Sequence, residues 1–224
     1  MGAMMQLLLI DNLAILLCTA AGFLFGAFRW LRPKKPLYAS MIVLGLGCVM
    51  LSRLFQCVWL WTGAGLTERF QIGVLGTAGA FSFFFSANFG QIDSLVDDGG
   101  KRLRAFRIAA WAGPLGIAAL YAAILLSPAK AELKAAFGFS SFLIAQASYF
   151  HVKHLLIPDV DYGVVRCQRG YNALALGMGV ASMVEMIALA RDMKTLVLAA
   201  GAALCVLSLA LVPMMNRGVK KWTT

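Results

Sequence analysis

The chain has 224 residues, of which 61% are hydrophobic and only 13% are charged, and its mean hydropathy is +0.79. A water-soluble domain of this size would have too little polar surface to cover so many apolar side chains. The formal charge of +10 would suit a nucleic-acid-binding protein. The Lys and Arg residues, however, stand at the ends of apolar runs and not in one basic stripe, so the pattern argues against nucleic acid and indicates a membrane protein.

Seven apolar runs follow one another along the chain, each close to the roughly 20 residues that a helix needs to cross a membrane. The predicted spans are 5–28, 37–61, 70–92, 105–127, 133–153, 171–190 and 195–215. The first run lacks the basic segment that precedes a cleaved signal peptide, so we expect it to stay as an anchor. The sequence therefore predicts an all-α, polytopic membrane protein, a seven-transmembrane-helix bundle that forms a single domain over residues 1–224.

Lys and Arg are distributed unevenly over the gaps between these runs. Fourteen fall in or beside the gaps after the first, third and fifth runs and in the C-terminal tail, whereas five fall in the other gaps. Cytoplasmic loops keep an excess of Lys and Arg. We therefore predict an integral protein, of the bacterial cytoplasmic membrane, with its N-terminus outside and its C-terminus in the cytoplasm.

Small residues recur at one-turn spacing inside several runs. They include Gly22 and Gly26, Gly73 and Gly76, and the set Ala173, Gly177 and Ala181. In lipid, small side chains let helix backbones approach closely, so these positions are predicted to be packing contacts. No internal repeat is evident along the sequence.

Arg53 is the one basic residue well inside an apolar run. It stands eight residues from the outer end of the second span, which places it about 12 Å below that end. A charge at this depth normally faces the bundle interior and has a partner. Glu185 is the only carboxylate at a similar depth, so we predict an Arg53–Glu185 contact. Asp11 is a candidate second partner, and Gln56 lies one turn from Arg53 on the same face.

The leading functional hypothesis is a receptor-like or sensory protein that binds a small molecule from outside, with Arg53, Glu185, Gln56 and Asp11 as ligand-binding residues. A helix shift would pass ligand occupancy to a separate cytoplasmic output protein. One alternative is a small-solute transporter that uses the same charges. Another is a purely structural salt bridge between two helices. The bilayer is the expected environment, and the chain is a candidate homo-oligomer.

A second polar group is predicted at the cytoplasmic side. His151 and His154 are three residues apart and share one helical face. Acidic residues stand near the same side, namely Asp93, Asp97, Asp159 and Asp161. Together they form an alternative site, for a membrane-embedded enzyme with a general acid and base. The H-E-x-x-H spacing of metalloproteases is missing, so no metal ligand or catalytic residue is assigned and we lean against an enzyme.

No cofactor is predicted either. A retinal Schiff base needs a Lys in the middle of the last span, and the run 195–215 contains none. Haem held between helices needs histidines on facing spans, whereas His151 and His154 lie on one.

Overall fold

The computed structural model describes residues 3–62, 72–158 and 163–223, and the regular structure of these residues is entirely helical. The predicted all-α fold is confirmed. The helices are α1 (Ala3–Trp30), α2 (Leu37–Thr62), α3 (Ile72–Ala87), the π-helical η2 (Asn88–Asp93), α4 (Ser94–Val96), the 3₁₀ turn η3 (Lys101–Leu103), α5 (Arg104–Ala110), α6 (Ala112–Leu125), α7 (Ala131–Leu156), α8 (Val164–Ala190) and α9 (Lys194–Thr223).

Five described helical segments are long and apolar enough to cross a membrane, and they indicate an integral membrane protein. They are Met5–Trp30, Leu37–Thr62, Lys101–Leu125, Val164–Ala190 and Lys194–Lys221. The other two predicted spans correspond to α3 with η2 and to α7. The α-helical part of α3 has only 16 residues. Helix α7 carries polar side chains that are buried inside the bundle, including Ser140, Ser148 and His151.

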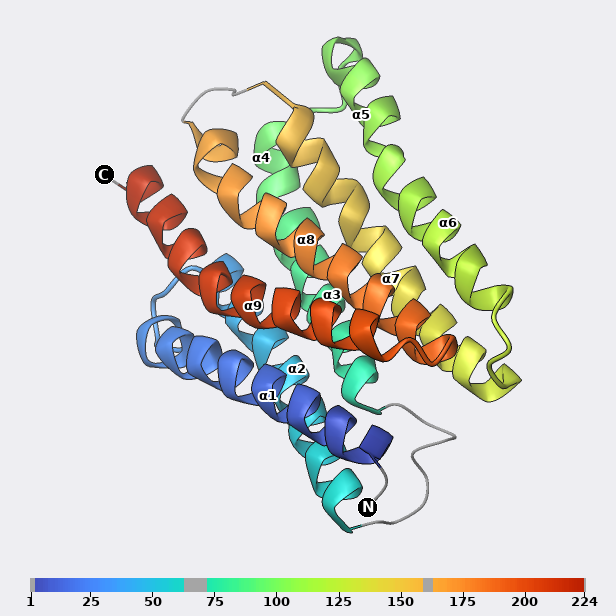
Figure 1. Ribbon diagram of the computed structural model, residues 1–224. Helices are drawn as coiled ribbons and strands as arrows, with labels where there is room; N and C mark the ends of the chain where they lie inside the picture. Colours follow the sequence, from blue (N-terminus) through green and yellow to red (C-terminus); the bar gives the residue numbers. More distant parts are fainter. Residues whose placement is uncertain (1–2, 63–71, 159–162, 224) are drawn as a thin grey trace.

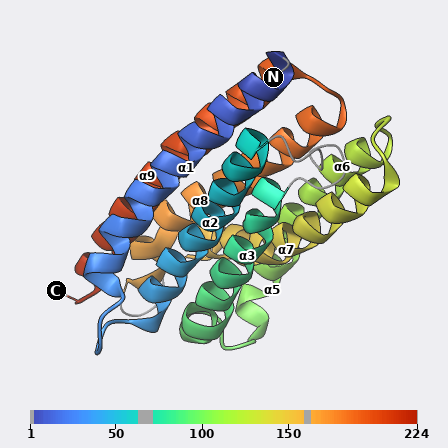
Figure 2. The same ribbon diagram turned by 90° about the horizontal axis from the view of Figure 1, so that it is seen from below.

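The long helices form two three-helix units with the same internal packing. In the first unit α2 lies between α1 and α3, and in the second unit α8 lies between α7 and α9 (Figure 1). Between the units, the first and second helices of each unit contact the third helix of the other. Thus α1 and α2 contact α9, and α7 and α8 contact α3. Figure 2 shows α2 and α8 at the centre, with the α1–α9 pair on one side and the α3–α7 pair on the other.

Equivalent helices of the two units run in the same direction. Helices α1 and α7 both run from the lower end of the bundle in Figure 1, where α1 begins, to the upper end, where α9 finishes. Helices α5 and α6 form the crossover between the units and pack outside them, on α7 and α8. The order and direction of the helices thus form a parallel internal repeat.

Paired glycines occupy equivalent positions in the two central helices. In α2, Gly45 packs against Phe84 of α3 and Gly47 against Phe23 of α1. In α8, Gly177 packs against α9 and Gly179 against Ile144 of α7. In each unit the first glycine therefore faces the third helix and the second glycine faces the first helix. A Cβ at Gly45 would lie 2.6 Å from a ring carbon of Phe84, so this approach requires glycine.

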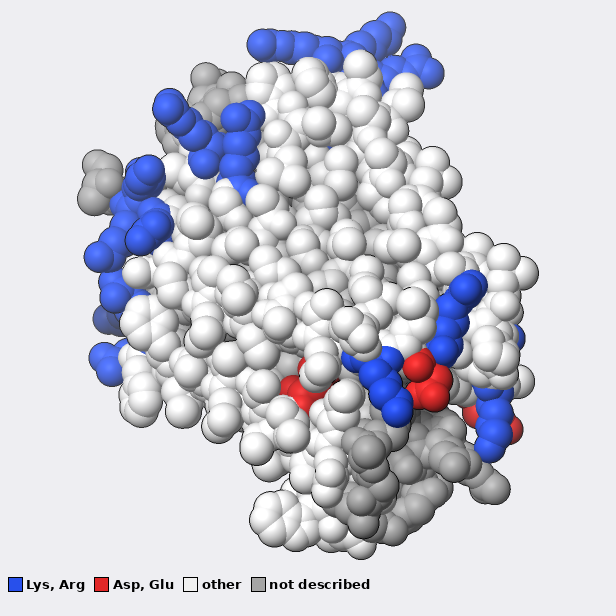
Figure 3. All heavy atoms as spheres, viewed as in Figure 1, with Lys and Arg blue, Asp and Glu red and all other residues white. Residues whose placement is uncertain are grey.

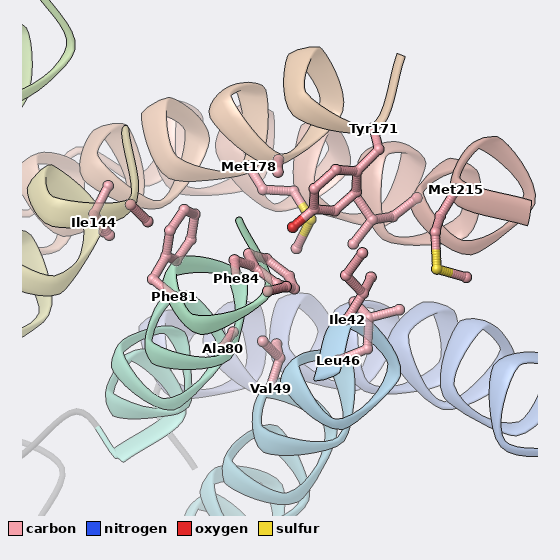
Figure 4. Close-up of a cluster of buried hydrophobic side chains, with 14 of the residues drawn as sticks. Ile42, Leu46, Val49, Ala80, Phe81, Phe84, Ile144, Tyr171, Met178 and Met215 are labelled. Carbon is pink, nitrogen blue, oxygen red and sulfur yellow. The ribbon is translucent and has the colours of Figure 1, made fainter. Parts of the chain in front are cut away.

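The core between the units is apolar. Side chains from α2, α3, α7, α8 and α9 meet there (Figure 4), and those labelled are Ile42, Leu46, Val49, Ala80, Phe81, Phe84, Ile144, Tyr171, Met178 and Met215. This apolar layer separates a polar centre near the lower end from another at the upper end.

Charges gather at the two ends of the molecule. Figure 3 shows Lys and Arg along the upper and left rim and a smaller mixed group at the lower right, with a broad, almost uncharged face between them. Exposed Leu17, Leu115 and Val206 belong to the apolar surface of the helices. Such a belt suits contact with lipid chains.

Candidate functional site

Arg53 and Glu185 form the centre of the lower polar site. Arg53 Nη1 donates to Glu185 Oε1 at 2.6 Å, and Nη2 donates to Oε2 at 2.6 Å. Both side chains are 1% exposed. The contact predicted from the sequence is therefore present, and its two parallel hydrogen bonds are the strongest geometry that a guanidinium and a carboxylate can adopt.

Asn12 is the second partner of the guanidinium. Its Oδ1 accepts a hydrogen bond from Arg53 Nη1 at 2.9 Å, and its Nδ2 donates to the carbonyl of Leu8 at 2.8 Å, which fixes the orientation of the amide. The pair from α2 and α8 is thereby tied to α1 as well. Sequence reasoning missed Asn12, because a single amide inside an apolar run gives no signal of its own.

The other two predicted ligand-binding residues lie beside this pair without bonding to it. Gln56 Oε1 accepts from the backbone N–H of Gly73 at 3.2 Å and so joins α2 to α3. Asp11 is buried against Gly201 of α9. Among the described residues, its Oδ2 has no hydrogen-bond partner.

Arg53 and Glu185 occupy matching places in the repeat. Each stands six positions after the second glycine of its Gly-x-Gly pair, Gly47 in α2 and Gly179 in α8. Because these glycines make equivalent contacts in the two units, the two charges are equivalent positions that carry opposite signs. The salt bridge therefore joins the units across their interface.

A small closed cavity of about 10 Å³ lies beside Arg53, between the units. Five of their six helices line it, and its polar lining residues are Arg53, Thr77, Ser182 and Ser208. In the described part of the chain, Arg53 Nε and Ser208 Oγ are buried without a hydrogen-bond partner. This volume has room for about one water molecule, so a larger ligand requires the units to separate.

The upper polar site is a buried network that we call the histidine network: Asn88, Asp93, His151, Lys153, His154 and Asn172. Asn172 Nδ2 donates to the carbonyl of Gln168, so Asn172 Oδ1 faces the network and accepts from Asn88 Nδ2 at 3.1 Å. His151 Nδ1 lies 2.9 Å from the same Oδ1. Both histidines and both asparagines are fully buried.

The π-helical segment η2 brings two of these residues onto one face. In an α-helix, with 3.6 residues per turn, positions 88 and 93 would be about 140° apart. In a π-helix the i→i+5 hydrogen bonds stack Asp93 nearly over Asn88. Both side chains then reach α7, where Asn88 Oδ1 lies 3.3 Å from His154 Nδ1 and Asp93 Oδ1 lies 3.2 Å from His154 Nε2. Single π-helical turns of this kind are frequent at functional sites.

Three ion pairs extend the network towards solvent. Lys153 Nζ lies 2.7 Å from Asp93 Oδ1 and 2.7 Å from Asp97 Oδ2, and Arg107 of α5 binds Asp97 Oδ1 at 2.8 Å. Lys153 Nζ and His154 Nε2 both contact the carboxylate of Asp93. Burial raises the pKa of Asp97, but hydrogen bonds from Lys153 and the N–H of Gly99 outweigh this effect and hold that pKa below its usual value.

A further contact at the upper end joins the two central helices. Tyr38 of α2 donates through its hydroxyl to Gln168 Oε1 of α8 at 2.7 Å, and its ring packs edge-on against Tyr171 at 5.6 Å between centroids. Sequence reasoning did not single out Tyr38, Gln168 or Asn172 as site residues.

The structure therefore assembles the four predicted acid–base residues that it describes, His151, His154, Asp93 and Asp97. Asp159 and Asp161 lie outside the described residues. Within the described ranges, no three His, Cys, Asp or Glu side chains come close enough together to hold a metal ion.

Comparisons of the chain with protein-family models, with curated proteins and with solved structures found no match. The site is therefore interpreted from its own geometry.

Proposed function

We propose that the chain is a seven-helix carrier of a small polar or anionic solute, working by alternating access between its two three-helix units. One observation carries the proposal: the Arg53–Glu185 pair joins equivalent positions of the two units beside a closed central cavity. Carriers built from parallel repeats bind their solutes near the midplane, at the interface of the repeats. A guanidinium beside a cavity that is also lined by the hydroxyl groups of Ser182 and Ser208 suits an anion or a strong hydrogen-bond acceptor.

In this proposal the structure is the occluded state, closed at both ends. Arg53, Glu185 and Asn12 close the lower end, and the Tyr38–Gln168 bond together with the histidine network closes the upper end. The apolar layer lies between the two closures. Rocking one unit against the other would break one set of contacts at a time, which is what alternating access requires.

The seven-span topology belongs to the same proposal, with α3–η2 and α7 as the third and fifth spans. The upper end would face the cytoplasm, because it carries most of the Lys and Arg residues. A protease site added after residue 224 should be cut in inside-out vesicles and be protected in intact cells. Cleavage in intact cells would reverse the orientation.

The carrier can be tested without knowing its solute, by asking from which side the cavity opens. Ser182, which lines the cavity, is replaced by Cys in a background lacking the five native cysteines. A charged, membrane-impermeant methanethiosulfonate is then applied to one side of the membrane at a time. We expect Ser182→Cys to be labelled from both sides, because each end opens in turn.

The control is Ser148→Cys, the same change at a buried serine of α7. Ser148 lies against Gly113 of the crossover and not against the cavity, so it should resist labelling from both sides. Labelling of Ser182→Cys from outside alone would contradict the carrier and support the receptor-like protein. If Ser182→Cys is labelled from neither side, both the carrier and the receptor-like protein are contradicted, and the remaining hypothesis is an enzyme at the histidine network.

A further inference from the structure

The histidine network crosses the interface between the two units, and this position gives it a second role. Asn88 and Asp93 come from the π-helical end of α3, in the first unit. His151, Lys153 and His154 come from α7 and Asn172 from α8, in the second. The hydrogen bonds of Asn88 and Asp93 to Asn172, Lys153 and His154 therefore cross the interface.

The orientations of the amides fix what the two nitrogens of His154 face. Asn172 is oriented by the carbonyl of Gln168, and Asn88 is oriented in turn by Asn172 Oδ1. The oxygen of Asn88 is therefore left for His154 Nδ1, which must carry a hydrogen. The other ring nitrogen, Nε2, faces a carboxylate oxygen of Asp93.

Each ring nitrogen of His154 faces an oxygen that can accept a hydrogen bond. To donate to both oxygens, the imidazole must carry a hydrogen on each nitrogen. This is one proton more than a neutral imidazole and a carboxylate have together. If His154 were neutral with its hydrogen on Nδ1, the lone pair of Nε2 would point at Asp93. The extra proton therefore lies between His154 and Asp93. Asp93 also binds Lys153 Nζ at 2.7 Å, and this contact stabilises the carboxylate and places the proton on the imidazole.

Two cations and two carboxylates lie around His154, and Lys153 of α7 and Arg107 of α5 pair with Asp93 and Asp97. From α8 the neutral Asn172 and Gln168 face the network, and Arg169 donates to the carbonyl of Ile157. The protonated His154 is thus held by Asn88 and Asp93, both of which belong to the opposite unit.

His151, one turn earlier in α7, differs from His154 in the contacts of its ring nitrogens. Its Nδ1 contacts Asn172, and in the described structure its Nε2 is buried without a hydrogen-bond partner among the rings of Phe81, Phe84 and Tyr171. A charged imidazole without a counterion in these surroundings would be costly. His151 is therefore the neutral member of the pair.

We propose that His154 and Asp93 form a proton-binding site whose occupancy is coupled to closure of the upper end, so that the pH on the upper side biases the carrier between its open and closed states there. This coupling rests on the proposed function; the proton site itself does not. A hydronium ion on the upper side gives its proton to His154 Nε2 and leaves as water when the upper end closes and Asp93 approaches. The proton returns to water on the upper side when the units part there. Acid then favours the state that is closed above, and alkali favours opening above.

The proton site is tested by ¹⁵N NMR of the histidine-labelled protein, which has only two imidazoles. In the wild-type protein at pH 7 we expect one doubly protonated ring and one neutral ring, assigned with His151→Gln. Asp93→Asn should abolish the doubly protonated signal. Two neutral rings in the wild-type protein, which needs no variant to fold, would overturn the proton site, as would a doubly protonated ring that persists in a folded Asp93→Asn protein.

The coupling is tested with the Ser182→Cys reporter and the same methanethiosulfonate. Lowering the pH should slow labelling from the upper side and speed labelling from the lower side, after correction for the reagent's own pH dependence on an exposed cysteine. His154→Gln should lose this opposite response, whereas His151→Gln should keep it. Two-sided labelling that ignores pH would refute the coupling and leave the carrier intact, whereas one-sided or absent labelling would refute the carrier itself.

Discussion

Arg53 of α2 is held by contacts to α1 and α8, and this arrangement decides what its removal would do. Its two terminal nitrogens bind Glu185 and Asn12, and its side chain lines the cavity. Breaking a buried ion pair by removing one member costs about 3–5 kcal/mol, mostly because the other charge is left uncompensated. Because each charge needs the other, the pair can hold the lower end closed. A solute anion that replaced Glu185 at the guanidinium would leave the Glu185 carboxylate without its partner.

Asp97 gives a prediction about acid stability. Its carboxylate is bound by Lys153 and Arg107, and the Asp97→Asn variant should be less stable at pH 7 by about 1–3 kcal/mol, the usual contribution of hydrogen bonds to a charged group. Because the folded-state pKa is lowered, this contribution is fully present above the unfolded-state value of about 4. It is lost as the pH falls through the lower folded-state value.

The measurement is thermal unfolding of both proteins in detergent from pH 7 downwards. The gap between their Tm values should be constant at first and should close only below about pH 4. A gap that widens on acidification would contradict the assignment of the ion pairs.

At the scale of single elements, the segment η2 positions the upper site. It extends α3 by a turn with i→i+5 hydrogen bonds, and it turns Asp93 towards Lys153 and His154. Nothing in the sequence Asn88–Asp93 marks a π-helix, because its residues are compatible with an ordinary helix. The histidine network was therefore predictable only as a set of neighbouring polar residues and not as an ordered chain of hydrogen bonds.

Inserting one Ala after Gly90 tests the register of the π-helical turn. Asn88 and Asp93 would then be six positions apart, about 120° around an α-helix, so the insertion should turn Asp93 away from α7. We expect a lower Tm and the loss of the doubly protonated histidine signal. Gly90→Ala is the matched control, because a Cβ there meets nothing within 4 Å and the length of the segment is unchanged. Equal effects of the two changes would show that the register of η2 is unimportant.

The whole molecule is organised by its repeat, which makes Arg53 and Glu185 exchangeable in principle. The double variant Arg53→Glu/Glu185→Arg keeps one cation and one anion at equivalent positions, and the Asn12 amide can turn its nitrogen to the new carboxylate. Each single substitution places two like charges in the interface and should lower stability by at least about 3–5 kcal/mol. The double variant should recover most of that loss.

Thermal unfolding of the wild-type protein, the two single variants and the double variant forms a double-mutant cycle that measures this coupling. A double variant no more stable than the single variants would show that the two positions are not equivalent.

The central ion pair could be predicted from the sequence because charged residues inside apolar runs are rare. Arg53 and Glu185 stand out because charges inside apolar runs are costly and need each other. The repeat was not predictable, because little besides Gly45 and Gly47, with their counterparts Gly177 and Gly179, marks it in the sequence, and the charges that follow them differ in sign. Amides and phenols such as Asn12, Asn172 and Tyr38 are common enough in membrane helices that only their three-dimensional contacts distinguish them.

The crossover α5–α6 makes an asymmetric centre possible. Two identical three-helix chains assembled in the same way would place either two arginines or two glutamates face to face, and neither arrangement neutralises itself. Joining the halves into one polypeptide allows each copy to change independently, so one could acquire the cation and the other the anion. The single polypeptide thus permits a neutral ion pair at a place where a symmetric homodimer would bury two like charges.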